Sequence, residues 1–455
     1  MKREEKFDVV VAGGGPSGIM AAIAAARSGA KTMLVERYGF LGGMATNALV
    51  GPLQTFHAGE KQIAKGLGEE AIQRLKKIGG TPGHVKDMIG FVPTVTPVDV
   101  EKLKFVYQEM VEESGVHLQL HTVVTGVQLG TDSNLEALHL YNKSGHFQVE
   151  GKAFVDCTGD GDVVHYSGVP YEKGRPKDGL AQPMSMMFRM GKVDLEQVKA
   201  YMKENVDDFV LADEWEDAPF VAVSGFFKLV EKGKKDGNLK VERDRVLFFE
   251  LPNEGEISVN MTRVIRYDAT DGQALSQAEV ISRRQVMEVV QFLQEYIPGF
   301  KESILINCGT QIGVRESRRI IGEYILTGED LINGKKFEDC IALGSYPIDI
   351  HAPDGDELNV IEMEPGTIYD IPYRSILNNK VRNLLVAGRC LSATHEALAS
   401  ARVTPTAMLV GQAAGTAAAM AAKAGVLPRE VDIKSLQESL RKQGCYLSEN
   451  EVEES

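Results

Sequence analysis

The chain has 455 residues, of which 43% are hydrophobic and 25% are charged, a composition typical of a water-soluble globular protein. This length is too great for one hydrophobic core and predicts roughly two or three domains. The formal net charge of −14 argues against nucleic acid or an anionic membrane surface as the main partner.

Three sequence features bear on the location of the protein. The charged N-terminus runs into an apolar strand, without the pattern of a signal peptide. The five cysteines are scattered and form no CxxC pair, which is typical of reduced thiols in the cytosol. Residues 403–422 are long enough to span a membrane, but they are mostly Ala, Gly and Thr and predict a buried helix. We therefore expect a cytoplasmic protein with no membrane partner.

The chain opens with a predicted strand, a glycine turn, a helix and a second strand. Residues 7–12 are an apolar run suited to a buried parallel strand. Gly-Gly-Gly-Pro-Ser-Gly follows at 13–18, then an Ala-rich helix to residue 29 and a strand at 32–35. This is the layout that holds the ADP half of a dinucleotide. A glycine turn without a ligand is the alternative.

Each residue of this turn has a physical role in the predicted site. Gly13 permits the tight turn, Gly15 lets the backbone approach a pyrophosphate, and Gly18 lets the helix pack tightly on the sheet. Pro16 and Ser17 suit the first helical turn, where free N–H groups and the positive end of the helix dipole favour a phosphate. All five residues are predicted to bind the cofactor.

Two charged residues follow the second predicted strand. Glu36 is predicted to accept hydrogen bonds from the adenosine ribose. A carboxylate there would repel a ribose 2′-phosphate and so argues against NADP. Arg37 weakens that argument, and it is included among the predicted cofactor-binding residues.

The pattern of apolar residues, caps and turn residues divides the chain into three segments. Residues 1–170 are predicted to form the first part of a nucleotide-binding domain. Residues 171–370, with more charge and longer loops, are predicted to form an inserted substrate domain. Residues 371–455 are predicted to complete the nucleotide-binding domain. The further elements expected are helices at 59–77, 97–114, 276–296, 403–425 and 432–444, strands at 116–127, 152–157 and 381–388, and hairpins at 135–149 and 246–264.

Three later motifs indicate FAD rather than NAD. They are Leu-Gly-Gly-Met-Ala-Thr at 41–46, Thr-Gly-Asp at 158–160 after an apolar strand, and Gly-Arg at 388–389 before a helix that begins near residue 404. An NAD site would need only the first glycine turn. The positive end of the last helix could stabilise charge on the flavin. Plain loops or turns are the alternative for the first two motifs. The cofactor-binding residues predicted here are Gly42, Gly43, Met44, Ala45, Thr158, Gly159, Asp160, Gly388, Arg389, Pro405 and Thr406.

On these motifs, together with Gly-Val-Arg-Glu-Ser-Arg-Arg at 313–319 and Gly-Gln-Ala-Ala-Gly at 411–415, the chain resembles the superfamily of fumarate reductase and succinate dehydrogenase flavoproteins and aspartate oxidase. More closely, it resembles a bacterial family known simply as FAD-dependent oxidoreductase. The resemblance implies an α/β fold. Its Rossmann-like FAD-binding domain, similar to glutathione reductase type 2, would be split by an inserted α+β substrate domain. It also implies that Val123 or Val124 contacts the adenine through backbone atoms.

The chain departs from its relatives at two places. The fumarate reductase group has a His-Gly-Ala-Asn-Arg segment, whereas here His395 and Arg402 are spaced differently, so dicarboxylate chemistry cannot be transferred. Disulfide reductases need two cysteines near the first glycine motif, but the first cysteine of this chain is Cys157.

Four residues are candidates for substrate chemistry. Arg402 could bind an anionic substrate or stabilise reduced flavin, and His395 could move protons. Arg315 is expected on a helix, on the same face as a nearby arginine at 318 or 319, and could bind an anion. His351, between two prolines, could face the site. For each of them a structural ion pair, hydrogen bond or loop position is the alternative.

We therefore expect an FAD-dependent oxidoreductase that transfers a hydride between a small organic substrate and flavin N5. The substrate and the electron donor or acceptor are left open, no metal site is predicted, and a homo-oligomer is possible. The alternatives are a redox subunit of a larger complex and a flavin-dependent RNA-modifying enzyme.

Overall fold

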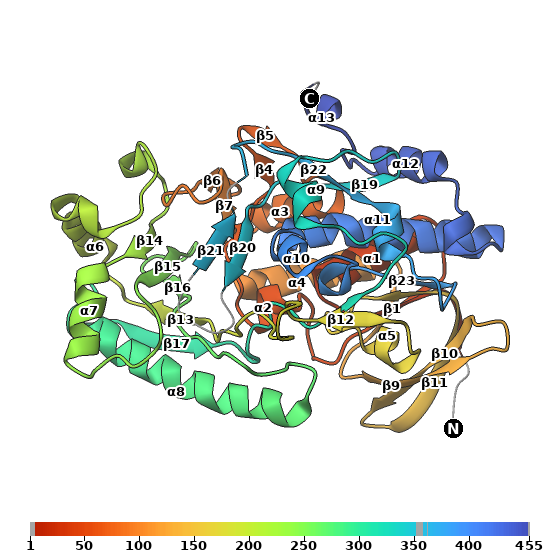
Figure 1. Ribbon diagram of the computed structural model, residues 1–455, viewed down its shortest axis with the longest axis horizontal. Helices are drawn as coiled ribbons and strands as arrows, with labels where there is room; N and C mark the ends of the chain where they lie inside the picture. Colours follow the sequence, from red (N-terminus) through yellow and green to blue (C-terminus); the bar gives the residue numbers. More distant parts are fainter. Residues whose placement is uncertain (1–4, 352–357, 362, 454–455) are drawn as a thin grey trace.

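The computed structural model describes residues 5–351, 358–361 and 363–453. A seven-stranded sheet with helices around it forms one part of the molecule, and a five-stranded sheet with a long helix forms the other (Figure 1). The expected α/β architecture is confirmed.

The parallel half of the larger sheet has the strand order of a dinucleotide-binding fold. Its strands lie in the order β8-β2-β1-β11-β23. From β1, the strand order continues to β2 and β8 on one side. On the other side of β1 lies β11, so the order reverses between β1 and β11. At such a reversal the carboxyl ends of the strands flank a crevice that binds ligands. The bounds are β1 Glu5–Ala12, β2 Thr32–Val35, β8 His117–Gln119, β11 Gly145–Asp156 and β23 Leu384–Val386.

The antiparallel half of this sheet corrects two expectations. A single strand, β11, replaces the two expected at 147–149 and 152–157, because its first half pairs with β10 and its second half enters the parallel sheet. The strand expected at 116–127 is divided into β8 and β9, since His121 has a φ of 52° that no extended strand accommodates. The bounds are β9 Val123–Leu129 and β10 Leu135–Asn142.

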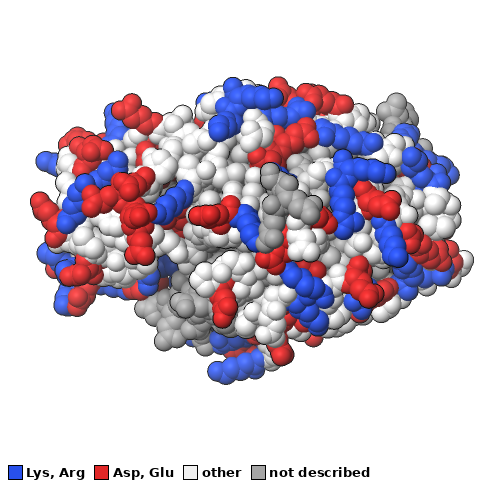
Figure 2. Space-filling model, turned by 90° about the horizontal axis from the view of Figure 1, so that it is seen from above, with Lys and Arg blue, Asp and Glu red and all other residues white. Residues whose placement is uncertain are grey.

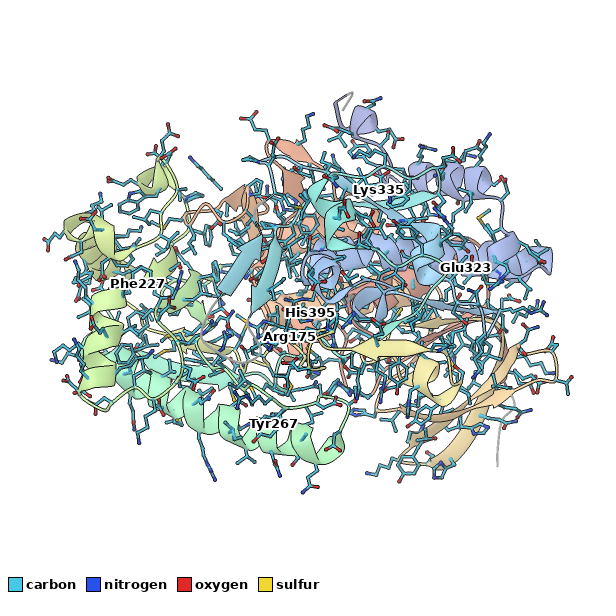
Figure 3. All side chains as sticks on the ribbon, viewed as in Figure 1. Arg175, Phe227, Tyr267, Glu323, Lys335 and His395 are labelled. Carbon is cyan, nitrogen blue, oxygen red and sulfur yellow. The ribbon has the colours of Figure 1, made fainter. Side chains whose placement is uncertain are left out.

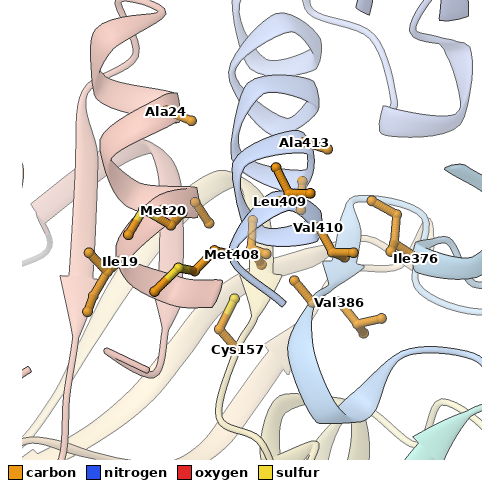
Figure 4. Close-up of a cluster of buried hydrophobic side chains, with 14 of the residues drawn as sticks. Ile19, Met20, Ala24, Cys157, Ile376, Val386, Met408, Leu409, Val410 and Ala413 are labelled. Atoms are coloured by element: carbon orange, nitrogen blue, oxygen red, sulfur yellow. The ribbon is translucent and has the colours of Figure 1, made fainter. Parts of the chain in front are cut away.

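Two helices that are far apart in sequence pack against each other. They are α1 (Pro16–Arg27) and α11 (Thr404–Ala424), whose side chains meet in one buried cluster (Figure 4). A Cβ on Gly411 would lie 2.1 Å from the Ser17 carbonyl oxygen, so only a residue without a side chain fits there. The buried small-residue helix is confirmed, and the described part of the chain holds no helix that combines the length and hydropathy of a membrane span.

Local capping explains where the flanking helices begin. Asp99 caps α4 by accepting hydrogen bonds from the Glu101 and Lys102 N–H groups. The helix expected at 59–77 begins only at Gly66, because a short hairpin occupies residues 57–62. The bounds are α3 Gly66–Lys77, α4 Val100–Glu113 and α12 Ile433–Lys442.

The smaller sheet has its own hydrophobic core. Its order is β14-β15-β16-β13-β17, and the expected hairpin at 246–264 forms β15 and β16. Most of this second core comes from residues 184–314, whereas the buried apolar residues from 320 onward, apart from Tyr346 and Ala407, join the first core. The domain limits at 170 and 370 stay predictions. The bounds are β13 Phe188–Gly191, β14 Ala222–Gly225, β15 Val246–Glu250, β16 Ile257–Val259, β17 Ile304–Cys308, α6 Leu195–Glu204, α7 Phe227–Lys235 and α8 Gly272–Tyr296.

Short elements connect these parts. The remaining strands are β3 Leu53–Gln54, β4 His57–Ala58, β5 Lys61–Gln62, β6 Val85–Lys86, β7 Thr94–Thr96, β12 Tyr171–Lys173, β18 Arg318–Ile320, β19 Cys340–Gly344, β20 Ile348–His351, β21 Leu358–Ile361 and β22 Tyr369–Pro372. The remaining α-helices are α2 Met44–Asn47, α5 Asp162–Tyr166, α9 Gly328–Ile332, α10 His395–Ala401 and α13 Glu449–Glu453.

Candidate active site

A cavity of about 100 Å³, partly open to solvent, lies at the carboxyl ends of β1, β2, β11 and β23. Parts of all four glycine motifs and the start of α11 line it, so segments from both ends of the chain meet there. The lining residues are Gly13, Gly15, Pro16, Ser17, Glu36, Arg37, Tyr38, Gly43, Met44, Asn47, Cys157, Thr158, Gly159, Ala387, Gly388, Arg389, Arg402, Thr404 and Ala407.

Several predicted cofactor residues do not line the cavity. A Cβ on Gly18 would lie 1.7 Å from the Gly13 carbonyl oxygen, so Gly18 packs α1 on the turn as expected. Val123 and Val124 begin β9, on the outer strand of the antiparallel half. The predicted residues outside the lining set are Gly18, Gly42, Ala45, Val123, Val124, Asp160, Pro405 and Thr406.

Two glycines form a cradle that suits a pyrophosphate. A Cβ on Gly15 would meet its nearest atom, the Gly43 Cα, only at 3.8 Å, and both residues line the cavity. No side chain caps α1 at Gly15, so its first N–H groups are available to an anion. A side chain at position 15 would fill the space between the two backbones. Glycine leaves this space open, so the cradle fits the phosphates of FAD.

The predicted ribose acceptor, Glu36, also shapes the turn. Its two carboxylate oxygens accept hydrogen bonds from the Gly14 N–H at 2.6 Å and the Tyr38 N–H at 2.8 Å. Burial raises the pKa of Glu36, and these two hydrogen bonds oppose the rise. Each oxygen has a further lone pair, so the carboxylate can hold the turn and still accept a ribose hydroxyl.

Arg37 and Tyr38 connect this wall to the second core. Arg37 Nη2 donates to Gln311 Oε1 at 2.7 Å, and the Tyr38 hydroxyl reaches the same oxygen. Burial opposes the charge of Arg37, but nearby Tyr38 and Asp160 outweigh it and raise its pKa. No glycine or charge pattern marks Tyr38, and the same is true of buried Asn47 at the end of α2.

An ion pair connects the Thr-Gly-Asp motif directly to the Gly-Arg motif. Asp160 Oδ1 accepts from Arg389 Nη2 at 3.0 Å and from Ser317 Oγ at 2.8 Å. Gly159 has a φ of 79° and lies against the Arg389 guanidinium, where a Cβ would clash at 2.5 Å. This ion pair therefore connects the ends of β11 and β23 at the cavity.

The helix expected to carry Arg315 is wrong, because residues 314–317 form neither a helix nor a strand and β18 follows them. Arg318 and Arg319 are neighbours on β18, where successive side chains point to opposite faces, so the three arginines have different partners. Arg315 reaches the Pro183 carbonyl, Arg318 reaches the Asp160 carbonyl, and Arg319 pairs with a neighbouring glutamate.

Arg402 is the one predicted substrate-chemistry residue among those that line the described cavity. It follows α10 and donates from Nη2 to Gln182 Oε1 at 3.1 Å. Its Nε is buried and has no hydrogen-bond partner in the described part of the chain, and burial lowers its pKa. The guanidinium therefore retains donor capacity at the wall of the cavity.

His395 lies behind this wall, near the centre of the molecule (Figure 3). Its Nδ1 lies 3.0 Å from Glu316 Oε1, and Glu316 also pairs with Arg319 and accepts the Gln182 N–H at 3.0 Å. The buried Glu316 thus holds Gln182, whose side chain contacts Arg402. The backbone of His351 ends β20, while its side chain lies outside the described residues.

The sequence of this chain is similar to those of known proteins. The model of a family described as FAD dependent oxidoreductase matches residues 8–440. Over 87 residues, 19% of this chain, the sequence is 40% identical to the tRNA uridine 5-carboxymethylaminomethyl modification enzyme of Aquifex aeolicus, and the match spans only 12% of that enzyme.

Two solved structures are among those to which the chain is similar. A geranylgeranyl bacteriochlorophyll reductase-like protein from Thermoplasma acidophilum has a TM-score of 0.48 at 13% identity, covering 99% of this chain and 91% of its own. L-proline dehydrogenase from P. horikoshii has a TM-score of 0.45 at 11% identity, covering 97% of this chain and 99% of its own.

Proposed function

Because this chain belongs to the family of FAD dependent oxidoreductases, we propose that it transfers a hydride between a small organic substrate and N5 of its FAD. The isoalloxazine ring supplies N5 as the hydride donor or acceptor, while the protein supplies position, charge and a path for protons. The observation that best supports this proposal is the position of Arg402. It brings a cation with unused donors to the wall of the cavity that the glycine motifs line.

The cavity suggests how the chain holds the cofactor. The Gly15–Gly43 cradle and the N-terminus of α1 would receive the pyrophosphate, and Glu36 would accept the ribose hydroxyls. Arg389, held by Asp160, would lie beside the ribityl chain. The start of α11 would place the positive end of its helix dipole toward the flavin ring.

On the substrate side, the structure favours separate roles for the two predicted residues. Arg402 would bind the substrate, because it lines the cavity. His395 would act as a positioning residue, because it contacts Glu316 and does not line the cavity. The link from His395 through Glu316 and Gln182 would then orient the Arg402 guanidinium.

The test uses the purified yellow holoenzyme in an anaerobic screen of small organic substrates. We expect one of them to bleach the flavin absorbance. Arg402→Gln should retain its flavin content while bleaching at least about a hundredfold more slowly. Arg245→Gln, which removes a cation from a partly exposed ion pair with Asp244, is the control. Equal bleaching rates in the wild type and Arg402→Gln would contradict the proposed site.

The same screen separates the alternatives. A redox subunit would bleach only with a partner protein. A tRNA-modifying enzyme, suggested by the short match to the Aquifex aeolicus enzyme, would bind tRNA with a steep salt dependence. The face in Figure 2 carries both charge signs interspersed rather than a basic stripe, which favours the small-substrate proposal. The free cysteines among the described residues favour a reducing, cytoplasmic location.

A further inference from the structure

Asn47, the last residue of α2, has a buried side-chain amide without a hydrogen-bond partner. None of its surface is exposed to solvent. Neither the amide nitrogen nor the amide oxygen has a hydrogen-bond partner among the described residues. Most buried polar side chains in folded proteins are paired, and an unpaired one destabilises the folded state. The amide therefore calls for a partner from outside the described chain.

The backbone of Asn47 is held from two sides. Its N–H donates to the Gly43 carbonyl at 2.7 Å, and its carbonyl accepts from the Thr310 N–H at 2.7 Å. Thr310 belongs to the loop that follows β17, so a segment of the second core fixes a residue of the cavity wall. A backbone fixed in this way leaves the amide little freedom to turn toward another group of the chain.

The polar side chains next to Asn47 are bound to one another. Gln311 Oε1 accepts from Arg37 Nη2 at 2.7 Å and from the Tyr38 hydroxyl. Burial raises the pKa of Tyr38, whereas the charge of Arg37 and the Asn47 amide lower it, so the amide lies beside this hydroxyl. The amide nitrogen of Gln311, a residue with 5% of its surface exposed, also lacks a partner in the described part of the chain. Two side-chain amides of this region thus retain unused hydrogen-bonding capacity.

The position of Asn47 relates it to the phosphate cradle. Asn47 and Gly43 both line the cavity, and Gly43 is one of the two glycines of the cradle. Four residues of helix are about one turn, or about 6 Å along the axis. In FAD, each phosphate is bonded to a sugar unit, the ribose of the adenosine on one side and the ribityl chain on the other. The groups of FAD next to a bound pyrophosphate therefore carry hydroxyls on either side.

A hydroxyl is the group that matches both atoms of the unpaired amide. It donates one hydrogen bond and accepts others, so sugar hydroxyls can pair with the amide nitrogen, a donor, and with the amide oxygen, an acceptor. A phosphate oxygen could accept from the nitrogen only and would leave the amide oxygen unpaired. The face of an aromatic ring would leave both atoms unpaired.

We propose that Asn47 binds FAD, with its side-chain amide donating to and accepting from sugar hydroxyls next to the pyrophosphate. The proposal goes beyond the proposed function, because it concerns how the cofactor is held and not which substrate is oxidised or reduced. Gln311 would act as a positioning residue, because it holds Arg37 and Tyr38 at the wall but does not itself line the cavity.

Fluorescence titration of flavin-free protein with FAD, combined with urea unfolding, tests the proposal without measuring turnover. Asn47→Leu keeps the approximate size of the side chain and removes both hydrogen-bonding atoms. It should bind FAD at least about tenfold more weakly, the value of one or two neutral hydrogen bonds. The flavin-free variant should be at least as stable as the wild type, because an apolar group replaces an unpaired amide. Asn379→Leu, at an exposed position, should bind FAD like the wild type.

Two smaller probes distinguish the two sources of hydroxyls. ADP carries the ribose, and FMN carries the ribityl chain. Asn47→Leu should bind ADP more weakly if the amide pairs with the ribose, and FMN more weakly if it pairs with the ribityl chain. Either result supports the proposal. Wild-type affinity for both probes would overturn the assignment to sugar hydroxyls.

Asn47→Ser keeps the proposal testable if Asn47→Leu fails to fold. Its hydroxyl retains a donor and an acceptor on a shorter side chain, so its affinity for FAD should lie below that of the wild type and above that of Asn47→Leu. The proposal is overturned if these variants bind FAD with wild-type affinity. It is also overturned if flavin-free Asn47→Leu is less stable than the wild type, because the amide would then have a partner within the chain.

The outcome is separable from that of the proposed function. Wild-type FAD affinity in Asn47→Leu, together with bleaching of the wild type by a small substrate, would overturn this inference alone. Weakened FAD binding in Asn47→Leu, with no substrate able to bleach the wild type, would support this inference and count against the proposed function.

Discussion

Replacing Gly15 with alanine should separate cofactor binding from folding. Gly15 has a φ of −76° and a ψ of −178°, a conformation open to any residue. The added Cβ would meet its nearest atom, the Gly43 Cα, at 3.8 Å, which is ordinary contact. The apo-protein should therefore be as stable as the wild type or gain about 0.4–1 kcal/mol, since alanine restricts the unfolded chain.

The same methyl group would stand in the phosphate cradle. It would keep a pyrophosphate from the backbone N–H groups of the turn and the first turn of α1. A hydrogen bond to a charged group contributes about 1.5–3 kcal/mol, so the loss of two would cost about 3–6 kcal/mol. We expect Gly15→Ala to weaken FAD binding by about two to four orders of magnitude.

The assay combines fluorescence titration of flavin-free protein with FAD and urea unfolding of the same protein. Gly18→Ala is the contrasting variant, because its Cβ would lie 1.7 Å from the Gly13 carbonyl oxygen. It should lower the free energy of unfolding by at least about 1–3 kcal/mol. Gly272→Ala, with no atom within 4 Å, should change neither quantity. Wild-type FAD affinity in Gly15→Ala would refute the reasoning.

Three further outcomes follow from the packing and charge of the chain. Gly411→Ala should lower the free energy of unfolding in urea by at least about 1–3 kcal/mol, because its Cβ would lie 2.1 Å from the Ser17 carbonyl oxygen. Glu316→Gln should lower it by about 3–5 kcal/mol, because Arg319, with 2% of its surface exposed, would lose its buried counter-ion. Burial lowers the pKa of His57 to about 4, and the charge of His84 adds to this. Below about pH 6.5 the His57 side chain is protonated in the unfolded chain but stays neutral in the folded protein. The contribution of His57 to the free energy of unfolding is therefore present above pH 6.5 and is lost as the pH falls toward 4. Urea unfolding between pH 7 and 4 measures that loss, and His57→Asn should reduce it.

Exposed counterparts serve as controls for the charged residues. Glu302 and His139 are exposed, so Glu302→Gln and His139→Asn should leave stability and its pH dependence near wild type. If Gly411→Ala has the same free energy of unfolding as the wild type, α1 and α11 are less closely packed than described. A loss in Glu316→Gln no larger than in Glu302→Gln would contradict the buried ion pair. Equal acid sensitivity of His57→Asn and the wild type would show that His57 is not the group responsible.

Local chemistry alone determined the first strand, the glycine turn and the helix that follows, because these depend on apolar runs, backbone freedom and helix ends within a few residues. The small-residue composition of 403–422 predicted a closely packed buried helix before its partner, α1, was known. The glycine motifs predicted the cofactor, which the family match confirms.

Only the tertiary structure decided which distant groups meet. The non-helical form of residues 313–317, the break at His121 and the continuous strand β11 all depend on contacts with remote segments, which outweigh local propensity. No motif marks Tyr38, Asn47 or Gln311. Their roles arise because packing brings them to the cavity or to the junction of the two cores, and the energy of a buried polar group in that place depends on neighbours far away in the sequence.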